Sequence, residues 1–489
     1  MRKSGILLSV SSLPSNYGIG TLGKSAYNFI DFLKESGQYY WQILPINPIS
    51  FGNSPYQSFS AFAFNPYYID LDELINWELL KKEEVTDLNW GKNQKRVDYG
   101  ELYINRPIIL KLVAKRFNKS DCEYLKFCTE NNFWLSDYSL FMAVKEKYNM
   151  LPLSALPQKF KKRDRDTIEK LKFQLKEEIE YHQITQFLFY KQWIKLKNYA
   201  KKNDIHIIGD IPIYVSADSS DVWSEPKLFT VDEKLKPIRV AGCPPDEFAP
   251  EGQLWGNPLY NWKEHENSDY CWWLKRTEQA SKLFDCLRID HFRGFYSYYS
   301  IDAKEKNAVN GKWIENNGEK LMNKIKENFP HSKIIAEDLG FIDDKIKERM
   351  ALSGFPGMKI LQFGFDSENS EHLPHNYIRN SVVYTGTHDN PTIKGWQGSA
   401  PMKNVEYAMD YLHVNFPGNL TDAFIRSAMS SVCDTAIIPM QDYLKQDNNS
   451  RMNTPSTIGD NWIYRIEDTD MGDNLTEKIY KLTRLYGRL

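Results

Sequence analysis

The segment LRIDHFRGF, Leu287–Phe295, decides how the rest of this sequence is interpreted. It begins as a β-strand and runs directly into a cluster of polar residues. Arg288 and Asp290 are two residues apart, so in a strand their side chains point to the same side. Charged residues at the carboxyl end of an apolar strand are typical of a β/α barrel, in which the strand ends carry the chemistry.

Similar apolar runs recur along the chain, separated by helical or loop-rich stretches. Eight of them are predicted to be strands, and eight is the strand number of a (β/α)8 TIM barrel. They are Gly5–Ser11, Tyr40–Pro45, His206–Val215, Leu287–Phe292, Lys333–Asp338, Met358–Phe365, Ser381–Thr387 and Ala436–Met440. The predicted fold is therefore α/β, a TIM barrel with large insertions between its strands.

The uneven spacing of these strands locates the insertions. Residues 1–489 are expected to form a single catalytic barrel unit, since no Gly/Ser linker or internal repeat divides them. A largely helical insertion is expected at 70–202 and a loop-rich one at 216–273. Loops at the carboxyl ends of barrel strands surround the active site, so we expect these insertions to wall a substrate groove.

Composition excludes several classes of protein. With 62 basic and 64 acidic residues the net charge is only -2, which offers no general attraction to nucleic acid or to an anionic membrane. The N-terminal stretch MRKSGILLSVSSLPS is too short to span a membrane and lacks a cleavage site, so a cytoplasmic location is expected. No CxxC, HExxH or other metal-binding spacing occurs, and neither a metal nor a cofactor is expected. The six cysteines are predicted to be reduced thiols.

Four acidic residues follow predicted strands: Asp210, Asp290, Glu337 and Asp389. A lone acid at such a place is more often a helix cap, but a barrel would bring all four to one face. Retaining glycosidases need an ionised carboxylate that attacks the anomeric carbon and a protonated one that donates to the leaving oxygen. Because Arg288 would hold Asp290 ionised, Asp290 is predicted to be the nucleophile and Glu337 the acid/base. His388, beside Asp389, is a candidate for binding sugar hydroxyls.

At these motifs the sequence resembles the 4-α-glucanotransferases called amylomaltases or disproportionating enzymes, a branch of the α-amylase superfamily. LRIDHFRGF, IIAEDLG and YTGTHDNPT occur in the family's order, and the resemblance covers almost the whole chain through SLPSNYGIGTLG, SPYQSFSAFAFNPYYIDL, GDIPIYVSADSSDVW, GCPPDEFAPEGQLWGNPLYNW, FPGMKILQFGF and RMNTPSTIGDNW.

The resemblance implies Asp290 as nucleophile, Glu337 as general acid/base and Asp389 as transition-state stabiliser. It implies sugar-binding roles for Tyr56, Asp210, Arg288 and His388, and it places Gln253, Trp255 and Asn257 in a loop that overhangs the acceptor side. The implied activity transfers a segment of an α-1,4-glucan to the 4-hydroxyl of glucose, maltose or a longer glucan, through a covalent glycosyl-aspartate. Its implied setting is maltodextrin, starch or glycogen metabolism.

Two positions depart from the family pattern. Glu247 stands where family members often have an aromatic residue, and the usual TPGT reads TPST at Thr454–Thr457. The region Asn149–Arg165 also matches the family poorly.

Three alternatives stay open at this point. Gly18–Ser25, GIGTLGKS, satisfies the pattern of a phosphate-binding P-loop, although SSLPSNY separates it from the preceding strand. Aromatic residues make up 14% of the chain, and sugar rings stack well on them. A non-catalytic glucan-binding protein would share this composition, but it would not need the three acids Asp290, Glu337 and Asp389. A hydrolase would use the same acids, since water can also release a glycosyl-enzyme.

Overall fold

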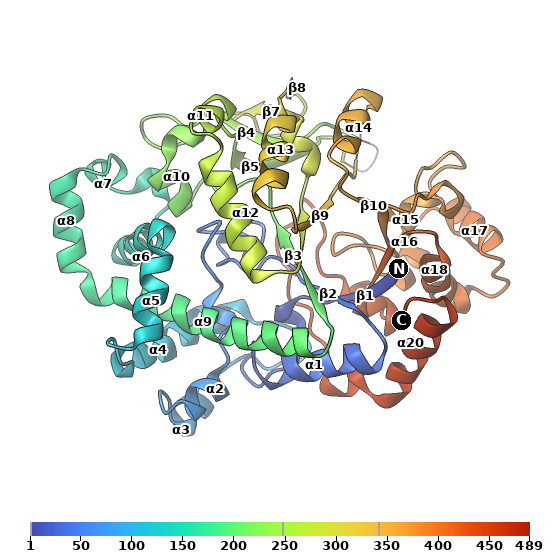
Figure 1. Cartoon of the computed structure of the whole chain (residues 1–489), viewed down its shortest axis with the longest axis horizontal. Coiled ribbons are helices and arrows are strands. Elements are labelled where there is room, and N and C mark those ends of the chain that lie inside the picture. Colours follow the sequence, from blue (N-terminus) through green and yellow to red (C-terminus); the bar gives the residue numbers. More distant parts are fainter. Residues whose placement is uncertain (1, 247–248, 341–342) are drawn as a thin grey trace.

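The computed structural model describes residues 2–246, 249–340 and 343–489. Its centre is an eight-stranded parallel sheet in the order β10-β11-β12-β1-β2-β3-β6-β9 (Figure 1). A hydrogen bond from Ala336 N to the Pro356 carbonyl (2.9 Å) joins the two edges, so the sheet is nearly closed. The strands are β1 (Lys3–Leu7), β2 (Tyr40–Gln42), β3 (His206–Ile211), β6 (Cys286–Ile289), β9 (Lys333–Ala336), β10 (Gly357–Ile360), β11 (Ser381–Tyr384) and β12 (Thr435–Pro439). The predicted TIM barrel is confirmed.

Each predicted strand is present, but most end several residues earlier than predicted. β1 stops at Leu7 because Val10–Ser12 form a 3-10 turn whose N-cap is Ser9. β10 stops at Ile360, where the helix α15 (Leu361–Gly364) begins. The apolar runs are longer than the strands because the first loop residues on the carboxyl side are also buried. Apolar character alone therefore does not show where pairing ends.

The helices surround the barrel and build its insertions (Figure 1). They are α1 (Lys24–Glu35), α2 (Leu71–Asn76), α3 (Lys82–Thr86), α4 (Tyr99–Arg116), α5 (Cys122–Glu130), α6 (Asn132–Lys147), α7 (Gln158–Lys161), α8 (Arg165–Gln174), α9 (Lys176–Lys202), α10 (Ser220–Ser224), α11 (Trp262–Asn267), α12 (Cys271–Leu283), α13 (Gly318–Asn328), α14 (Asp344–Ala351), α16 (Ile393–Ser399), α17 (Met402–Tyr411), α18 (Leu420–Ser430), α19 (Met440–Tyr443) and α20 (Asp473–Leu485). None of the helices in the described part of the chain is long and apolar enough to cross a membrane.

The helices α2–α9 lie between β2 and β3, and Figure 1 shows α4–α8 on one side of the barrel. Two buried glutamines of α9 attach the segment that leads into them. Gln186 exchanges hydrogen bonds with both backbone groups of Phe64 (2.7 and 2.9 Å), and Gln192 does the same with Asp70 (2.7 and 3.0 Å). The ring of Phe64 also stacks on Phe189 of α9. One continuous apolar core therefore joins these helices to the barrel.

A second, antiparallel sheet has the order β5-β4-β7-β8. Its strands are β4 (Arg239–Cys243), β5 (Gln253–Pro258), β7 (Ser297–Asp302) and β8 (Lys312–Glu315). None of these strands was predicted, because each is short and the central pairing, β4 with β7, joins two segments that are far apart in the sequence. The region 216–273 contains β4 and β5 besides its loops and the short helices α10 and α11.

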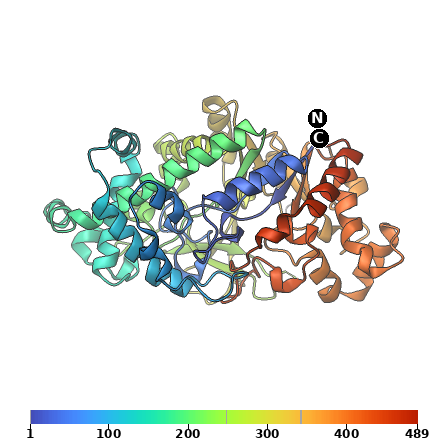
Figure 2. The same ribbon diagram turned by 90° about the horizontal axis from the view of Figure 1, so that it is seen from below.

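The two termini lie side by side in both views (Figures 1 and 2). Arg488 is fully buried, and its guanidinium donates to the Lys3 carbonyl (2.9 Å) and to carbonyls at the end of α18. The last residues of the chain thereby cover the amino end of the barrel beside β1. All six cysteines lie in the described part of the chain, and all are free thiols.

Candidate active site

Strand pairing brings the predicted acids together at the carboxyl end of the barrel. β3 pairs with β6 so that Asp210 is opposite Arg288, and β6 pairs with β9 so that Ile289 is opposite Ala336. Asp290 and Glu337 each follow one of that last pair, and Glu337 N donates to the Ile289 carbonyl (3.1 Å). The two candidate catalytic carboxyls are therefore neighbours on adjacent strand ends.

Arg288 is the charged centre of the site. Its guanidinium contacts both carboxylate oxygens of Asp210 (2.7 Å each) and Oδ1 of Asp290 (3.1 Å). Burial opposes the charge of Arg288, but Asp210 and Asp290 raise its pKa well above the ordinary value. Asp210 is 2% exposed and also accepts a hydrogen bond from the Tyr56 hydroxyl (2.7 Å). Asp210 therefore anchors Arg288 and Tyr56 below the more open Asp290.

Glu337 is held by backbone donors. Its two carboxylate oxygens accept hydrogen bonds from His291 N (2.5 Å) and Leu339 N (2.9 Å). His291 directs its N–H this way because its backbone is left-handed, with φ 46°, which is strained for a residue with a side chain. Burial raises the pKa of Glu337, and Arg288 opposes that rise. A raised pKa suits a general acid, but the pKa of Asp290 is raised as well, so the contacts of each carboxyl, not its pKa, distinguish the two roles.

Asp290 shares this environment and carries a stronger perturbation. Burial raises the pKa of Asp290 well above its ordinary value, the Arg288 guanidinium counteracts that rise, and the charge of Glu337 reinforces it. The charge of Glu337 beside Asp290 disfavours ionisation of both carboxyls at once. Of these two carboxyls, Asp290 forms a described ion pair with Arg288 and Glu337 does not. This contact favours ionised Asp290 in the state with one proton on the pair.

The segment after β11 places His388 and Asp389 across the site. The ring of His388 stacks on Tyr56, with centroids 5.1 Å apart, and its Nε2 lies 3.5 Å from Oδ1 of Asp389. Burial lowers the pKa of His388, so its imidazole is neutral at pH 7. The side chain of Asp389 keeps 45% of its surface exposed, unlike the buried Asp210. Asp389 is therefore accessible to solvent.

Three residues that were not singled out in the sequence support this segment. Asn453 donates to Oδ1 of Asp389 (2.6 Å), and Arg451 donates to the Asp389 carbonyl (2.5 Å). Trp462 lies with its ring centroid 5.8 Å from that of Tyr56 and 5.9 Å from that of His388. All three belong to RMNTPSTIGDNW, which matched the family but carried no charge pattern that assigns a role.

The three residues predicted for the acceptor side all lie on β5. Trp255 is half-buried, its ring contacts His291 edge-on at 4.9 Å, and its indole N–H donates to Gln253 (3.0 Å). Asn257 is buried instead and is occupied by the protein, because it donates to the Val215 carbonyl (2.8 Å) and accepts from Gln57 (2.9 Å). Trp255 thus lies beside His291, whose backbone N–H donates to Glu337, and Asn257 is held by the protein itself. The departure at Glu247 lies outside the described residues.

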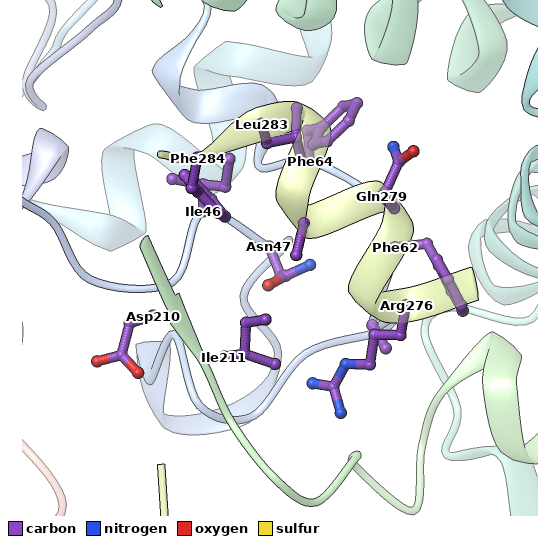
Figure 3. A pocket seen from close by; sticks show the side chains of 12 residues that line it. Ile46, Asn47, Phe62, Phe64, Asp210, Ile211, Arg276, Gln279, Leu283 and Phe284 are labelled. Carbon is purple, nitrogen blue, oxygen red and sulfur yellow. The ribbon is translucent and has the colours of Figure 1, made fainter. Parts of the chain in front are cut away.

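A small cavity lies behind β3. Figure 3 shows Ile211 directed towards α12 and the carboxyl of Asp210 directed away from it, as strand alternation requires. The cavity has a volume of about 30 Å³, which suits a water molecule and excludes a sugar ring. Arg276 of α12 lines it and donates to the Pro212 carbonyl (2.5 Å) and the Ile213 carbonyl (3.1 Å). The cavity is therefore a gap in the packing, and Arg276 beside it supports the segment that follows β3.

The P-loop pattern does not form a phosphate site. A side chain at Gly23, the N-cap of α1, would lie 2.0 Å from a carboxylate oxygen of Asp70. Asp70 accepts hydrogen bonds from the Thr21 hydroxyl (2.6 Å) and from Glu73 N (2.9 Å). The place that a phosphate would take at the start of this helix is thus filled by a carboxylate of the chain itself.

The fold and the gathered carboxylates define a barrel enzyme with its site at the carboxyl ends of the strands. Residues 8–470 match glycoside hydrolase family 77, described as 4-alpha-glucanotransferase. The chain belongs to the 4-alpha-glucanotransferase family, which confirms the resemblance seen in the sequence.

Similar proteins that carry the same name support this assignment over almost the full length of the chain. The 4-alpha-glucanotransferase of Clostridium butyricum is 48% identical, covering 98% of this chain and 100% of that protein. That of Thermus thermophilus is 42% identical, covering 95% of each. The structure of amylomaltase from Streptococcus agalactiae in complex with acarbose is similar with a TM-score of 0.97, 41% identity and complete coverage of both chains. Amylomaltase from Corynebacterium glutamicum, at 17% identity and a TM-score of 0.77, covers 100% of this chain and 74% of its own and shares the fold.

Proposed function

We propose that this enzyme moves a segment of an α-1,4-glucan to the 4-hydroxyl of glucose, maltose or a longer glucan by retaining double displacement. The arrangement of Asp290, Arg288 and Glu337 carries the proposal. An arginine contacts one carboxyl of an adjacent pair, and backbone N–H groups orient the other. The two carboxyls of such a pair can take different roles, the one that contacts the arginine as nucleophile and the other as proton donor.

In the first step, Glu337 gives its proton to the glycosidic oxygen as the C1–O bond breaks. The carboxylate of Asp290 forms a bond to C1, and the shortened sugar leaves with the new hydroxyl. In the second step, Glu337 takes the proton of the acceptor 4-hydroxyl, whose oxygen attacks C1 and releases Asp290. The α-1,4 bond is restored, and no redox partner is consumed.

The remaining site residues have supporting roles in this proposal. Asp389 is the exposed carboxylate that stabilises positive charge on the distorted sugar ring, with His388 as a neutral hydrogen-bonding partner. Tyr56 and Arg288 bind sugar hydroxyls around the site, and Asp210 holds both in place. Gln253 and Trp255 shape the acceptor side, where a bound sugar would exclude water. We further infer a cytoplasmic location, which the free thiols support.

Maltotriose is the substrate that tests the proposal. Chromatography should show glucose together with a ladder of longer oligosaccharides, whereas only shorter sugars would identify a hydrolase. Asp290→Asn should abolish turnover while maltotriose still binds, and quenched wild-type enzyme should carry glycosyl mass on the peptide that contains Asp290.

Asp285→Asn is the matched control, because Asp285 lies at the opposite end of the same strand and its carboxyl caps Ile207 N. This variant should keep full transfer activity. Normal turnover by Asp290→Asn would remove Asp290 from the mechanism.

A further inference from the structure

The segment that carries His388 and Asp389 is fastened at both ends to one buried side chain. This segment, Thr385–Thr392, connects β11 to α16. The Thr385 hydroxyl donates to Oδ2 of Asp442 (2.6 Å), and Ile393 N, just past the other end, donates to Oδ1 of Asp442 (2.8 Å). Asp442 lies in α19, directly after β12, and is 1% exposed. Two oxygens of one rigid carboxylate therefore set the separation between the ends of the segment.

Other contacts support the middle of the segment. Asn390 accepts hydrogen bonds from the backbone and the hydroxyl of Thr387 (2.8 Å each), and Gln362 donates to the Pro391 carbonyl (2.8 Å). The His388 carbonyl accepts from Asn453 N (3.1 Å). In the described chain, Asp442 is the side chain that contacts both ends. A shift of its carboxylate would therefore move the whole segment relative to the barrel.

The buried carboxylate of Asp442 is costly to maintain. It forms no ion pair among the described residues, and nearby Lys445 pairs with Asp422 instead (2.6 Å). Burial and, more weakly, the charge of Asp442 raise the pKa of Tyr443 of its own helix and of Tyr464, so both neighbours are neutral phenols and neither supplies a cation. Burial likewise raises the pKa of Asp442 to about 6. A buried acid without a cation is unfavourable for folding, so its presence here calls for another role.

We propose that Asp442 is a positioning residue for catalysis, which fixes His388 and Asp389 against the reacting sugar by clamping both ends of the Thr385–Thr392 segment. The inference rests on the function proposed above. It deepens that function, because the described hydrogen bonds of the Asp442 carboxylate go to Thr385 and Ile393 and not to Asp290 or Glu337. The residue would act only through the geometry of Asp389.

The variants Asp442→Ala, Asp442→Asn and Thr385→Val test this role in maltotriose transfer. Alanine releases both ends, and kcat should fall about 100-fold with KM changed by less than about threefold, since a misplacement near 1 Å has this effect. Asparagine can still accept from Ile393 N and can donate to the threonine hydroxyl, so it should restore kcat to within about tenfold of wild type. Thr385→Val releases one end and should fall between them.

Asp70 provides a control of nearly identical local chemistry. It is also a buried carboxylate that accepts one threonine hydroxyl and one backbone N–H, but it lies between α1 and α2, away from the site. Asp70→Ala and Asp70→Asn should lower the unfolding temperature as the Asp442 variants do, without lowering kcat in the folded enzyme.

Equal kcat values for folded Asp442→Ala and Asp70→Ala would overturn the inference. So would a rise in KM at unchanged kcat. If Asp442→Ala does not fold, the comparison is made on Asp442→Asn and Thr385→Val, and wild-type kcat in both would overturn it equally. Absence of transfer by the wild-type enzyme would instead refute the proposed function, which the same assay detects independently.

Discussion

Removing the charge of Arg288 should shift the pH dependence of the enzyme in a predictable direction. Its guanidinium lies 3.1 Å from Oδ1 of Asp290. At an effective dielectric constant of about 20, two unit charges at that distance interact by about 5 kcal/mol, equivalent to about 4 pKa units. The side chain of Asp290 is 30% exposed, so solvent screens part of this interaction, and we take about half of it, about 2 units.

Without Arg288, the pKa of Asp290 should therefore rise further. The acidic limb of the kcat/KM profile should move about 2 pH units upward, and activity on that limb should fall about 100-fold. Arg288→Met alone would also leave Asp210 buried without its cation, which costs about 3–5 kcal/mol of stability. The informative variant is therefore Arg288→Met combined with Asp210→Asn, compared with Asp210→Asn alone.

The assay is glucose release from maltotriose between pH 4.5 and 9, with thermal unfolding measured on each variant. The acidic limb of the double variant should lie above that of Asp210→Asn. Coinciding limbs would show that Arg288 does not control the ionisation of Asp290, and the electrostatic assignment of nucleophile and acid would be wrong.

Three further predictions concern other parts of the chain. Burial among aromatic rings lowers the pKa of His265 from 6.5 to about 4, so as the pH falls the unfolded chain binds this proton before the folded chain does, and the free energy of unfolding should fall by about 3 kcal/mol between pH 6.5 and pH 4. In urea unfolding, His265→Phe should lack this loss of stability, and an equal loss in both proteins would contradict the prediction. The backbone of Ser456 is left-handed, with φ 62°, at the position where the family's TPGT pattern has glycine, so Ser456→Gly should stabilise the protein by about 1 kcal/mol at unchanged kcat. A lower unfolding temperature of the variant would show that the serine backbone is not strained there. Gln57 links the loop that carries Tyr56 to β5 through hydrogen bonds to Asn257 and to the Trp255 carbonyl, so Gln57→Leu should raise the KM for acceptor glucose about tenfold at a constant donor concentration. An unchanged KM for the acceptor would show that other contacts hold β5.

The sequence predicted the strands and the residues at their ends because both are local properties. Alternation places Arg288 and Asp290 on one side of a strand wherever that strand lies. The eight apolar runs limit the fold to a barrel, and the barrel rule then gathers acids at the carboxyl ends. The motifs added the family, which the comparisons confirm.

Other features of the site could not be predicted in this way. Asn453 and Arg451 contact Asp389 only because the chain returns after β12, and nothing in their sequence neighbourhood marks that contact. Asn257, predicted to bind substrate, pairs in this structure with Val215 and Gln57, which are 42 and 200 residues away. A buried side-chain amide forms hydrogen bonds with the polar groups that the packing places beside it, so its partners depend on the fold.

The sequence by itself determined the fold class, the order of the strands along the chain and the residue types at their ends. These features depend on hydrophobic periodicity and residue type, which can be seen in residues that are close together in the sequence. Only the tertiary structure decided which of those groups meet. Strand register set Asp210 opposite Arg288, a left-handed backbone at His291 turned its N–H to Glu337, and Asp442 joined both ends of the segment that carries Asp389. These contacts follow from burial of apolar surface shared by distant segments, a property of the whole chain rather than of any short stretch.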